Sequence, residues 1–212
     1  MTASTSPSAP SAGLDHRDLG IGARFTVAVM ADDYAGIILG ALAEADGAGL
    51  EVVTDPVSTL VRGPEQRVLE YLRDVIAGAA RGGRHVSASV LLSRGCPGEV
   101  TCATTPELLD RAAEVPVLAP TGVHAAAHWS LYPLDDTGRP GRAPDHLRDI
   151  YAAIDHAKEL GTYVRGEHYA TLLAGDLAEV LATVAAGWVL VGRGVQHVTS
   201  HAIVSIASPT EA

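Results

Sequence analysis

LEVVTDPVSTLVRGP (50–64) and TYVRGEHYATLLAGD (162–176) are two versions of one segment, 112 residues apart. The same offset joins residue pairs in this segment and in a later one: Thr59 with Thr171, Gly63 with Gly175, His85 with His197, and Ser93 with Ser205. One offset kept over two separate stretches indicates a duplicated module. Any functional site should therefore exist in two related versions.

Each copy has the periodicity of a β-α-β-β-α-β unit. In the first copy we expect strands and helices at 23–30, 34–46, 50–54 and 57–62, then a helix from Pro64 and a strand at 85–93. In the second copy we expect them at 127–134, 145–160, 162–173 (a hairpin), 176–190 and 197–206. This order predicts an α+β fold of two tandem ferredoxin-like repeats, each an antiparallel four-stranded sheet with both helices on one face.

Four regions follow from this pattern. Residues 1–22 are expected to be a disordered tail, 23–94 the first repeat, 95–125 a connector and 126–208 the second repeat. The connector is long enough to let the second sheet fold back onto the first. Phe25 aligns with Trp129 at an offset of only 104, so the second repeat gains eight residues before its hairpin, most simply in DTGRPGRAP (136–144).

Composition narrows the class of protein. The chain has 212 residues, 47% of them hydrophobic and 4% aromatic, and a net charge of −10. Two small units gain stability by packing together or by dimerising. The acidic balance argues against nucleic acid as a partner. No apolar run is long enough to cross a membrane and no signal-peptide core is evident, so we expect a cytoplasmic protein without membrane insertion.

Neither an enzyme motif nor a metal site is evident in the sequence. There is no nucleophile elbow, phosphate-binding loop or paired-histidine helix motif. His197 and His201 lie four residues apart on a predicted strand, too far apart to favour a metal. Cys96 and Cys102 are expected to be free thiols, with a short-loop disulfide or a metal as the alternatives. We therefore expect no catalytic residues, no metal and no cofactor.

Candidate binding residues recur in both copies. Strand alternation directs a polar set toward the face that the helices leave open: His85, Ser87 and Ser89, and in the second copy His197, Thr199 and His201. Thr59 and Thr171 are the hydroxyls of the third strands. They are candidates to contact a small heterocycle, although a threonine is also simply a good strand residue.

Carboxylates and aromatic residues complete the candidates. Asp32 and Asp136 follow the first strand of each copy, where they either cap the next helix or bind an amino group or a cationic ring. Asp55 and Glu167, in the hairpins, pose the same choice. Phe25, Trp129 and Tyr132 are expected to supply aromatic surface to a flat ligand.

Five stretches together resemble the YkoF family of thiamine- and hydroxymethylpyrimidine-binding proteins: FTVAVMADDY (25–34), VSTLVRG (57–63), SRGCPGE (93–99), WSLYPLDD (129–136) and GTYVRGEHYATLLAGD (161–176). The resemblance implies two ACT-like repeats, a homodimer and a pyrimidine-binding cleft in each repeat. It also implies that the protein binds thiamine or its hydroxymethylpyrimidine precursor in support of an uptake or salvage system.

The resemblance also implies particular contacts. Ser58 and Thr59 match the Ser-Thr pair of the family's third strand, and Thr59 is the first candidate for ligand contact. Thr171 matches by repeat position, but Ala170 replaces the serine there, so the two sites should not be identical. Pro56 stands where the family often has histidine, whereas the second repeat has His168.

Two other functions fit the same fold. An ACT-like sensor would bind an amino acid and modulate a partner. A cofactor-free dimeric enzyme of ferredoxin-like fold would use His85 or His197 as its base. Ligand choice distinguishes the first from a pyrimidine-binding protein, and turnover distinguishes the second.

Overall fold

The computed structural model describes residue 16 and residues 19–95, 114–134, 145–195 and 197–210. The predicted tail, both cysteines and the insert at 136–144 lie outside the described residues, apart from the end of the tail. No helix among the described residues is both long and apolar enough to cross a membrane.

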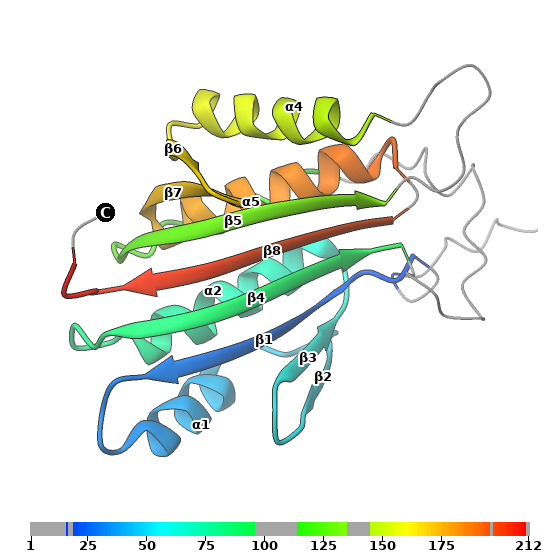
Figure 1. The fold of residues 1–212 in the computed structure, drawn as a ribbon. Helices are drawn as coiled ribbons and strands as arrows, with labels where there is room; N and C mark the ends of the chain where they lie inside the picture. The colour runs from blue at the N-terminus through cyan, green and yellow to red at the C-terminus, as the bar shows by residue number, and fades with distance from the viewer. Residues whose placement is uncertain (1–15, 17–18, 96–113, 135–144, 196, 211–212) are drawn as a thin grey trace, which may run out of the picture.

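The described residues form one antiparallel sheet of eight strands, in the order β2-β3-β1-β4-β8-β5-β7-β6 (Figure 1). The first repeat contains β1 (Gly22–Val29), α1 (Tyr34–Glu44), β2 (Glu51–Thr54), β3 (Thr59–Arg62), α2 (Glu65–Ala79) and β4 (Val86–Arg94). The second contains β5 (His124–Leu134), α4 (His146–Glu159), β6 (Tyr163–Glu167), β7 (Ala170–Asp176), α5 (Leu177–Gly192) and β8 (His197–Ile206). The predicted α+β fold with two βαββαβ repeats is therefore confirmed.

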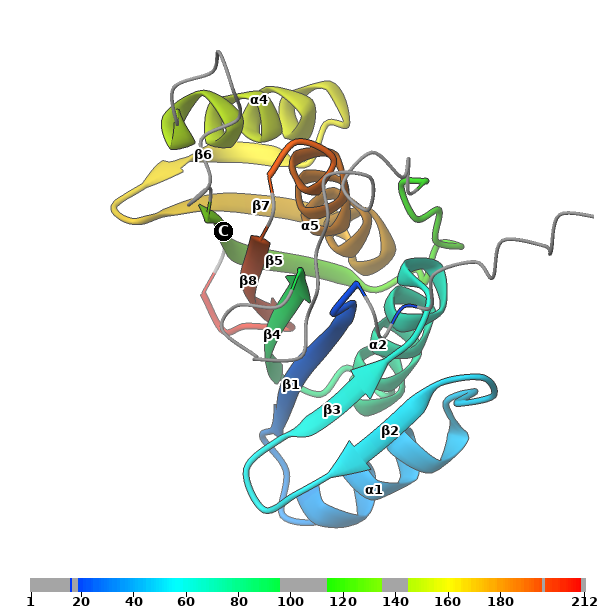
Figure 2. The ribbon, with the colours of Figure 1, turned by 90° about the vertical axis from the view of Figure 1, so that its right-hand side faces the viewer.

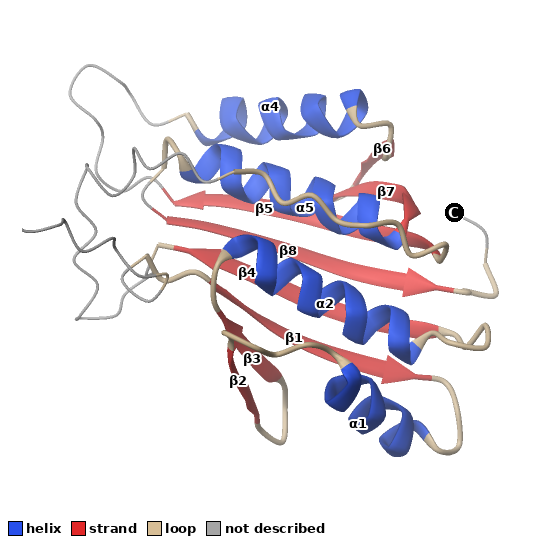
Figure 3. Ribbon diagram, turned by 180° about the vertical axis from the view of Figure 1, so that it is seen from behind, coloured by secondary structure: helices blue, strands red, loops and turns tan. Residues whose placement is uncertain are grey.

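The four helices that the structure describes all cover the same face of the sheet (Figure 3) and leave the other face open (Figure 1). The apolar stripe predicted for the second helix of the first repeat is buried against the sheet: Val68, Leu69, Leu72, Val75 and Ile76. The strands alternate in burial accordingly, as in β4 and β8, because successive side chains point to opposite faces. A ligand has two different surfaces available, one beneath the helices and one on the open face.

The strand register reproduces both sequence offsets. Phe25 pairs with Thr59 on one side and with Val90 on the other. In the second repeat Trp129 pairs with Thr171 and with Ala202. Each residue of the second set stands 104 or 112 positions after its counterpart. The duplication seen in the sequence is thus a duplication of individual backbone pairs.

The two repeats join edge to edge through β4 and β8. Val90 pairs with Ala202 in this ladder, and the two are equivalent residues, so a local twofold axis passes between them. The sequence had suggested that the connector lets the second sheet fold back onto the first; instead the second sheet extends the first. Each four-stranded unit has β4 or β8 as an edge, and pairing them satisfies the backbone groups that each edge would otherwise expose.

Asp176 joins the β6–β7 hairpin of the second repeat to helix α5, whose N-cap it forms. Its side chain accepts hydrogen bonds from the backbone N–H of Ala178, Thr121 and Gly122 at 2.7–3.1 Å, and forms a capping box with Glu179. Burial alone would raise the pKa of Asp176, but these bonds hold that pKa below its usual value. The equivalent residue of the first repeat is Pro64, and no side chain caps α2.

Candidate functional site

A small cavity lies in the first repeat between α1, β1 and the tip of the β2–β3 hairpin. Figure 2 shows how these elements are arranged. We call it the hairpin pocket. Its volume is about 160 Å³, the scale of a single substituted heterocycle, and its lining is Phe25, Thr26, Val27, Ile38, Leu39, Leu42, Thr54, Asp55, Pro56, Val57, Ser58 and Thr59.

The apolar walls come from β1 and α1. Phe25 lies on the helix-covered face of β1, and its ring meets Tyr71 of α2 edge to face, with the centroids 6.3 Å apart. From α1, Ile38 and Leu42 are half-buried, whereas Leu39 remains 64% exposed. Helix α1 buries only one residue fully, Ala41. Helix α1 is apolar but packs only loosely against β1, and this leaves room beside it for a ligand.

Two threonine hydroxyls supply polarity inside this apolar lining. Thr59, 5% exposed, pairs with Thr54 across the hairpin, and their Oγ1 atoms are 3.0 Å apart. Either hydroxyl can donate this bond, so the remaining lone pairs and the second proton can adapt to a ligand. The pocket thus offers both a donor and an acceptor.

The hairpin tip, residues 55–58, is closed by Asp55. Its Oδ1 accepts the backbone N–H of Val57 and of Ser58, each at 2.8 Å, and its own N–H donates to the Ser58 carbonyl at 2.9 Å. The amides of Ser58 and Val57, followed by the Arg24 guanidinium, hold the pKa of Asp55 below its usual value. Asp55 therefore presents a carboxylate at the pocket at neutral pH.

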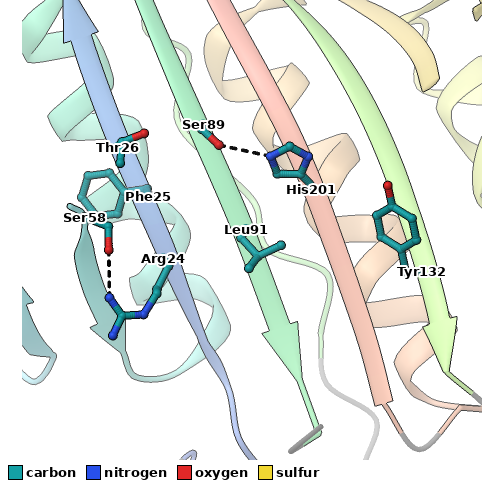
Figure 4. A pocket seen from close by; sticks show the side chains of 8 residues that line it. All are labelled: Arg24, Phe25, Thr26, Ser58, Ser89, Leu91, Tyr132 and His201. Atoms are coloured by element: carbon teal, nitrogen blue, oxygen red, sulfur yellow. Dashed lines mark hydrogen bonds between the residues drawn. The ribbon is translucent and has the colours of Figure 1, made fainter. Parts of the chain in front are cut away.

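A second, shallower hollow lies on the open face of the sheet (Figure 4). We call it the open-face groove. It has a volume of about 470 Å³ and is lined by Arg24, Phe25, Thr26, Ser58, Ser89, Leu91, Tyr132 and His201. Ser89 and His201 are equivalent residues of the two repeats, and their Oγ and Nε2 atoms lie 3.1 Å apart beside the local twofold axis.

The predicted site residues do not all meet in one place. Thr59, Ser58 and Phe25 line the hairpin pocket, and Tyr132 lines the open-face groove together with Ser58 and Phe25. The remaining polar candidates flank or belong to β4 and β8 and line neither hollow: His85, Ser87, His197 and Thr199. Ser87 and Thr199 lie on the open face, opposite to the face of Thr59, because Thr59 pairs with the helix-facing Phe25.

In the second repeat, Trp129 and Thr171 are paired neighbours on the helix-covered face, 2% and 6% exposed. The indole N–H of Trp129 donates to Ser200 Oγ at 2.8 Å. Asp32 is exposed in the loop before α1, and its neighbour Asp33 occupies the N-cap position without a side-chain capping bond. Asp136 lies outside the described residues.

Sequence reasoning missed two features of the hairpin pocket: the Thr54 hydroxyl in its lining, and the Arg24 guanidinium that binds the tip residues Asp55 and Ser58. Thr54 could have been found as the residue paired with Thr59 once the turn at Asp55-Pro56 set the hairpin register. Arg24 is a lone charge within an otherwise uncharged strand, which is a signal that it has a partner. Among the described residues no group of three or more metal-binding side chains occurs.

Comparison with known proteins relates this chain to a family and to a protein of similar length. The model of the YKOF-related family matches residues 20–99 and 124–211, which include the elements of both repeats. A Bacillus subtilis (strain 168) protein named "Putative HMP/thiamine-binding protein YkoF" is 30% identical over 189 residues, which are 89% of this chain and 91% of that protein.

Proposed function

The chain belongs to the YKOF-related family, and we propose that it binds hydroxymethylpyrimidine (HMP) or thiamine, with the aminopyrimidine ring in the hairpin pocket. The observation that carries this proposal is the pair of hydroxyls, Thr54 and Thr59, inside a small apolar cavity that has the Asp55 carboxylate at its rim. The name of the B. subtilis relative supports the choice of ligand.

The chemistry of the pocket fits an aminopyrimidine. Such a ring has apolar faces and an edge that carries both acceptor nitrogens and an amino donor. Phe25 and the α1 side chains would contact the faces, while the hydroxyls of Thr54 and Thr59 would meet the edge. Asp55 is an acceptor for the amino group and a favourable neighbour for the cationic thiazolium ring of thiamine.

We further propose that the protein releases its ligand unchanged and serves uptake or salvage of the pyrimidine. The B. subtilis relative is named for binding and not for a reaction. Mass spectrometry of HMP and thiamine after prolonged incubation with the protein should show both unchanged. Turnover that disappears in His197→Ala would favour the enzyme alternative instead.

Isothermal titration calorimetry with HMP and with thiamine tests the binding directly. Thr59→Val keeps the branched shape but removes the hydroxyl, so we expect affinity to fall about tenfold, the effect of losing one hydrogen bond. Ser205→Ala, on the open face, should bind as the unmodified protein does. The absence of heat with either ligand, or full affinity in Thr59→Val, would contradict the proposal. Thermal stabilisation by an amino acid alone would favour the sensor alternative.

We also propose that the protein is a homodimer. The open face exposes apolar side chains that a second copy would cover, among them Leu91, Tyr132 and Ile203. Sedimentation equilibrium should give twice the chain mass, and Ile203→Lys should lower it. A monomer at all concentrations would contradict this part of the proposal.

A further inference from the structure

Arg24 links the two faces of the sheet at the hairpin pocket. It projects from β1 on the open face, next to the helix-facing Phe25. Its Nη1 donates to Asp55 Oδ2 at 2.9 Å and to Ser58 Oγ at 2.8 Å. A single guanidinium nitrogen thereby ties β1 to two side chains of the hairpin tip.

Beyond the strand pairing of Thr59 with Phe25 at its base, this contact is the main link between the tip and β1. Val57 is 81% exposed, so apolar packing contributes little to its position. The remaining bonds of Asp55, to the backbone of Val57 and Ser58, lie within the tip and do not connect it to β1. The tip residues nevertheless form a third of the lining of the hairpin pocket, four of its twelve residues.

The second repeat lacks this arrangement among its described residues. His128 replaces Arg24, and Ala170, which has no hydroxyl, replaces Ser58. Glu167 replaces Asp55 but accepts a bond from Arg165 on its own strand, at 2.6 Å. That tip is held instead by a neutral bond from Ser130 Oγ to the Tyr169 carbonyl.

We propose that Arg24 is the positioning residue of the hairpin pocket: its guanidinium holds the tip against β1, so that the pocket is formed before the ligand arrives. The inference rests on the proposed function. Arg24 acts through Asp55 and Ser58 and does not itself bind the pyrimidine. A ligand binds only when the tip is in place. The measured affinity is therefore the affinity of the formed pocket multiplied by the fraction of time that the tip is in place.

Replacing Arg24 by methionine keeps a side chain similar to the aliphatic part of arginine and removes the guanidinium and its charge. In Arg24→Met we expect HMP affinity to fall about tenfold, which corresponds to a tip in place a tenth of the time. The HMP affinity of Arg24→Lys should lie between those of the unmodified protein and of Arg24→Met, because lysine keeps the charge but not the planar donor group. His128→Met, the equivalent change in the second repeat, is the matched control and should leave affinity unchanged.

Two further measurements separate positioning from direct contact and from a general loss of structure. Hydrogen exchange without ligand should speed up at the Val57 and Ser58 amides in Arg24→Met and stay unchanged in α2. In a double-mutant cycle, Ser58→Ala should cost little in the Arg24→Met background, because the bond that it removes is already absent there.

The outcomes are distinct. Unchanged exchange at the tip overturns the positioning role whether or not a ligand binds. Full HMP affinity in Arg24→Met overturns it while leaving the proposed function intact. Fully additive effects of Arg24→Met and Ser58→Ala also overturn it, because they would mean that the two side chains act independently. If the unmodified protein binds neither HMP nor thiamine, the proposed function fails, and the exchange experiment alone decides the role of Arg24.

Discussion

The two repeats share a backbone register but fill the space beneath their helices differently. In the second repeat Trp129 lies against α5, and the nearest approach is at Gly187, where a Cβ would come within 2.5 Å of the indole Cζ2. The first repeat has the smaller Phe25 at the strand position and Val75 at the helix position. The indole also needs Ser200 as an acceptor, where the first repeat has Ala88. The duplication thus conserves backbone pairing and leaves the packing of each half free to diverge.

The largest effect should come from breaking this size match. Gly187→Val copies the residue of the first repeat, but its side chain would collide with Trp129 in a fully buried helix segment. Overpacking of this kind typically costs about 1–3 kcal/mol, and we expect the upper end of that range in the free energy of unfolding measured by urea titration.

A second substitution tests the cause of that loss. Adding Trp129→Phe to Gly187→Val restores the pair found in the first repeat and should recover part of the stability, because the two residues are in contact. Additive losses in the double variant would show that Gly187 is needed for another reason.

The junction between hairpin and helix differs in its response to acid. Asp176 of the second repeat has a pKa held low by hydrogen bonds, whereas the equivalent Pro64 does not titrate. A carboxyl group whose pKa is lowered on folding stabilises the protein at pH values above its pKa in the unfolded chain, near 3.9. This contribution is lost as the pH falls through the lower pKa of the folded state.

Asn offers one acceptor oxygen where Asp176 uses both, so Asp176→Asn should cost about 1 kcal/mol at pH 7. The cost should become progressively less below about pH 4, as the unmodified protein loses the same contribution. Urea titrations between pH 7 and pH 3 measure the difference between the two proteins. Asp155→Asn, at an exposed position on α4, is a control for a general change in charge. A constant difference across this range would show that the carboxylate acts through shape and not through charge.

The sequence predicted much of the fold and less of the site, and the reasons are physical. The offsets of 104 and 112 already showed which residues of the two repeats are equivalent, and the matching strand pairs Phe25–Thr59 and Trp129–Thr171 agree with them. Strand alternation showed the direction of Ser87 and Thr199 but not that Thr59 points to the other face, since that depends on how β3 pairs with β1. The contact of Arg24 with the hairpin tip joins residues more than thirty positions apart, which no local periodicity encodes.

The smallest expected effect concerns the hydroxyl pair, which only the first repeat has. Gly166 is the residue opposite Thr171, in the place of Thr54, and it has no side chain to offer. A Cβ at Gly166 would meet no atom within 4 Å, so Gly166→Thr is expected to be accommodated. The new hydroxyl would lie across from Thr171 and rebuild the polar pair of the hairpin pocket in the second repeat.

We expect Gly166→Thr to raise the thiamine affinity of the second repeat a few-fold, the value of part of one hydrogen bond. Calorimetry in the Thr59→Val background, where the first site is weakened, would isolate this gain. Gly166→Val, which has the same branched shape without the hydroxyl, is the matched control and should not reproduce it. Equal affinity in Gly166→Thr and Gly166→Val would mean that a filled strand position, and not the hydroxyl pair, distinguishes the two repeats.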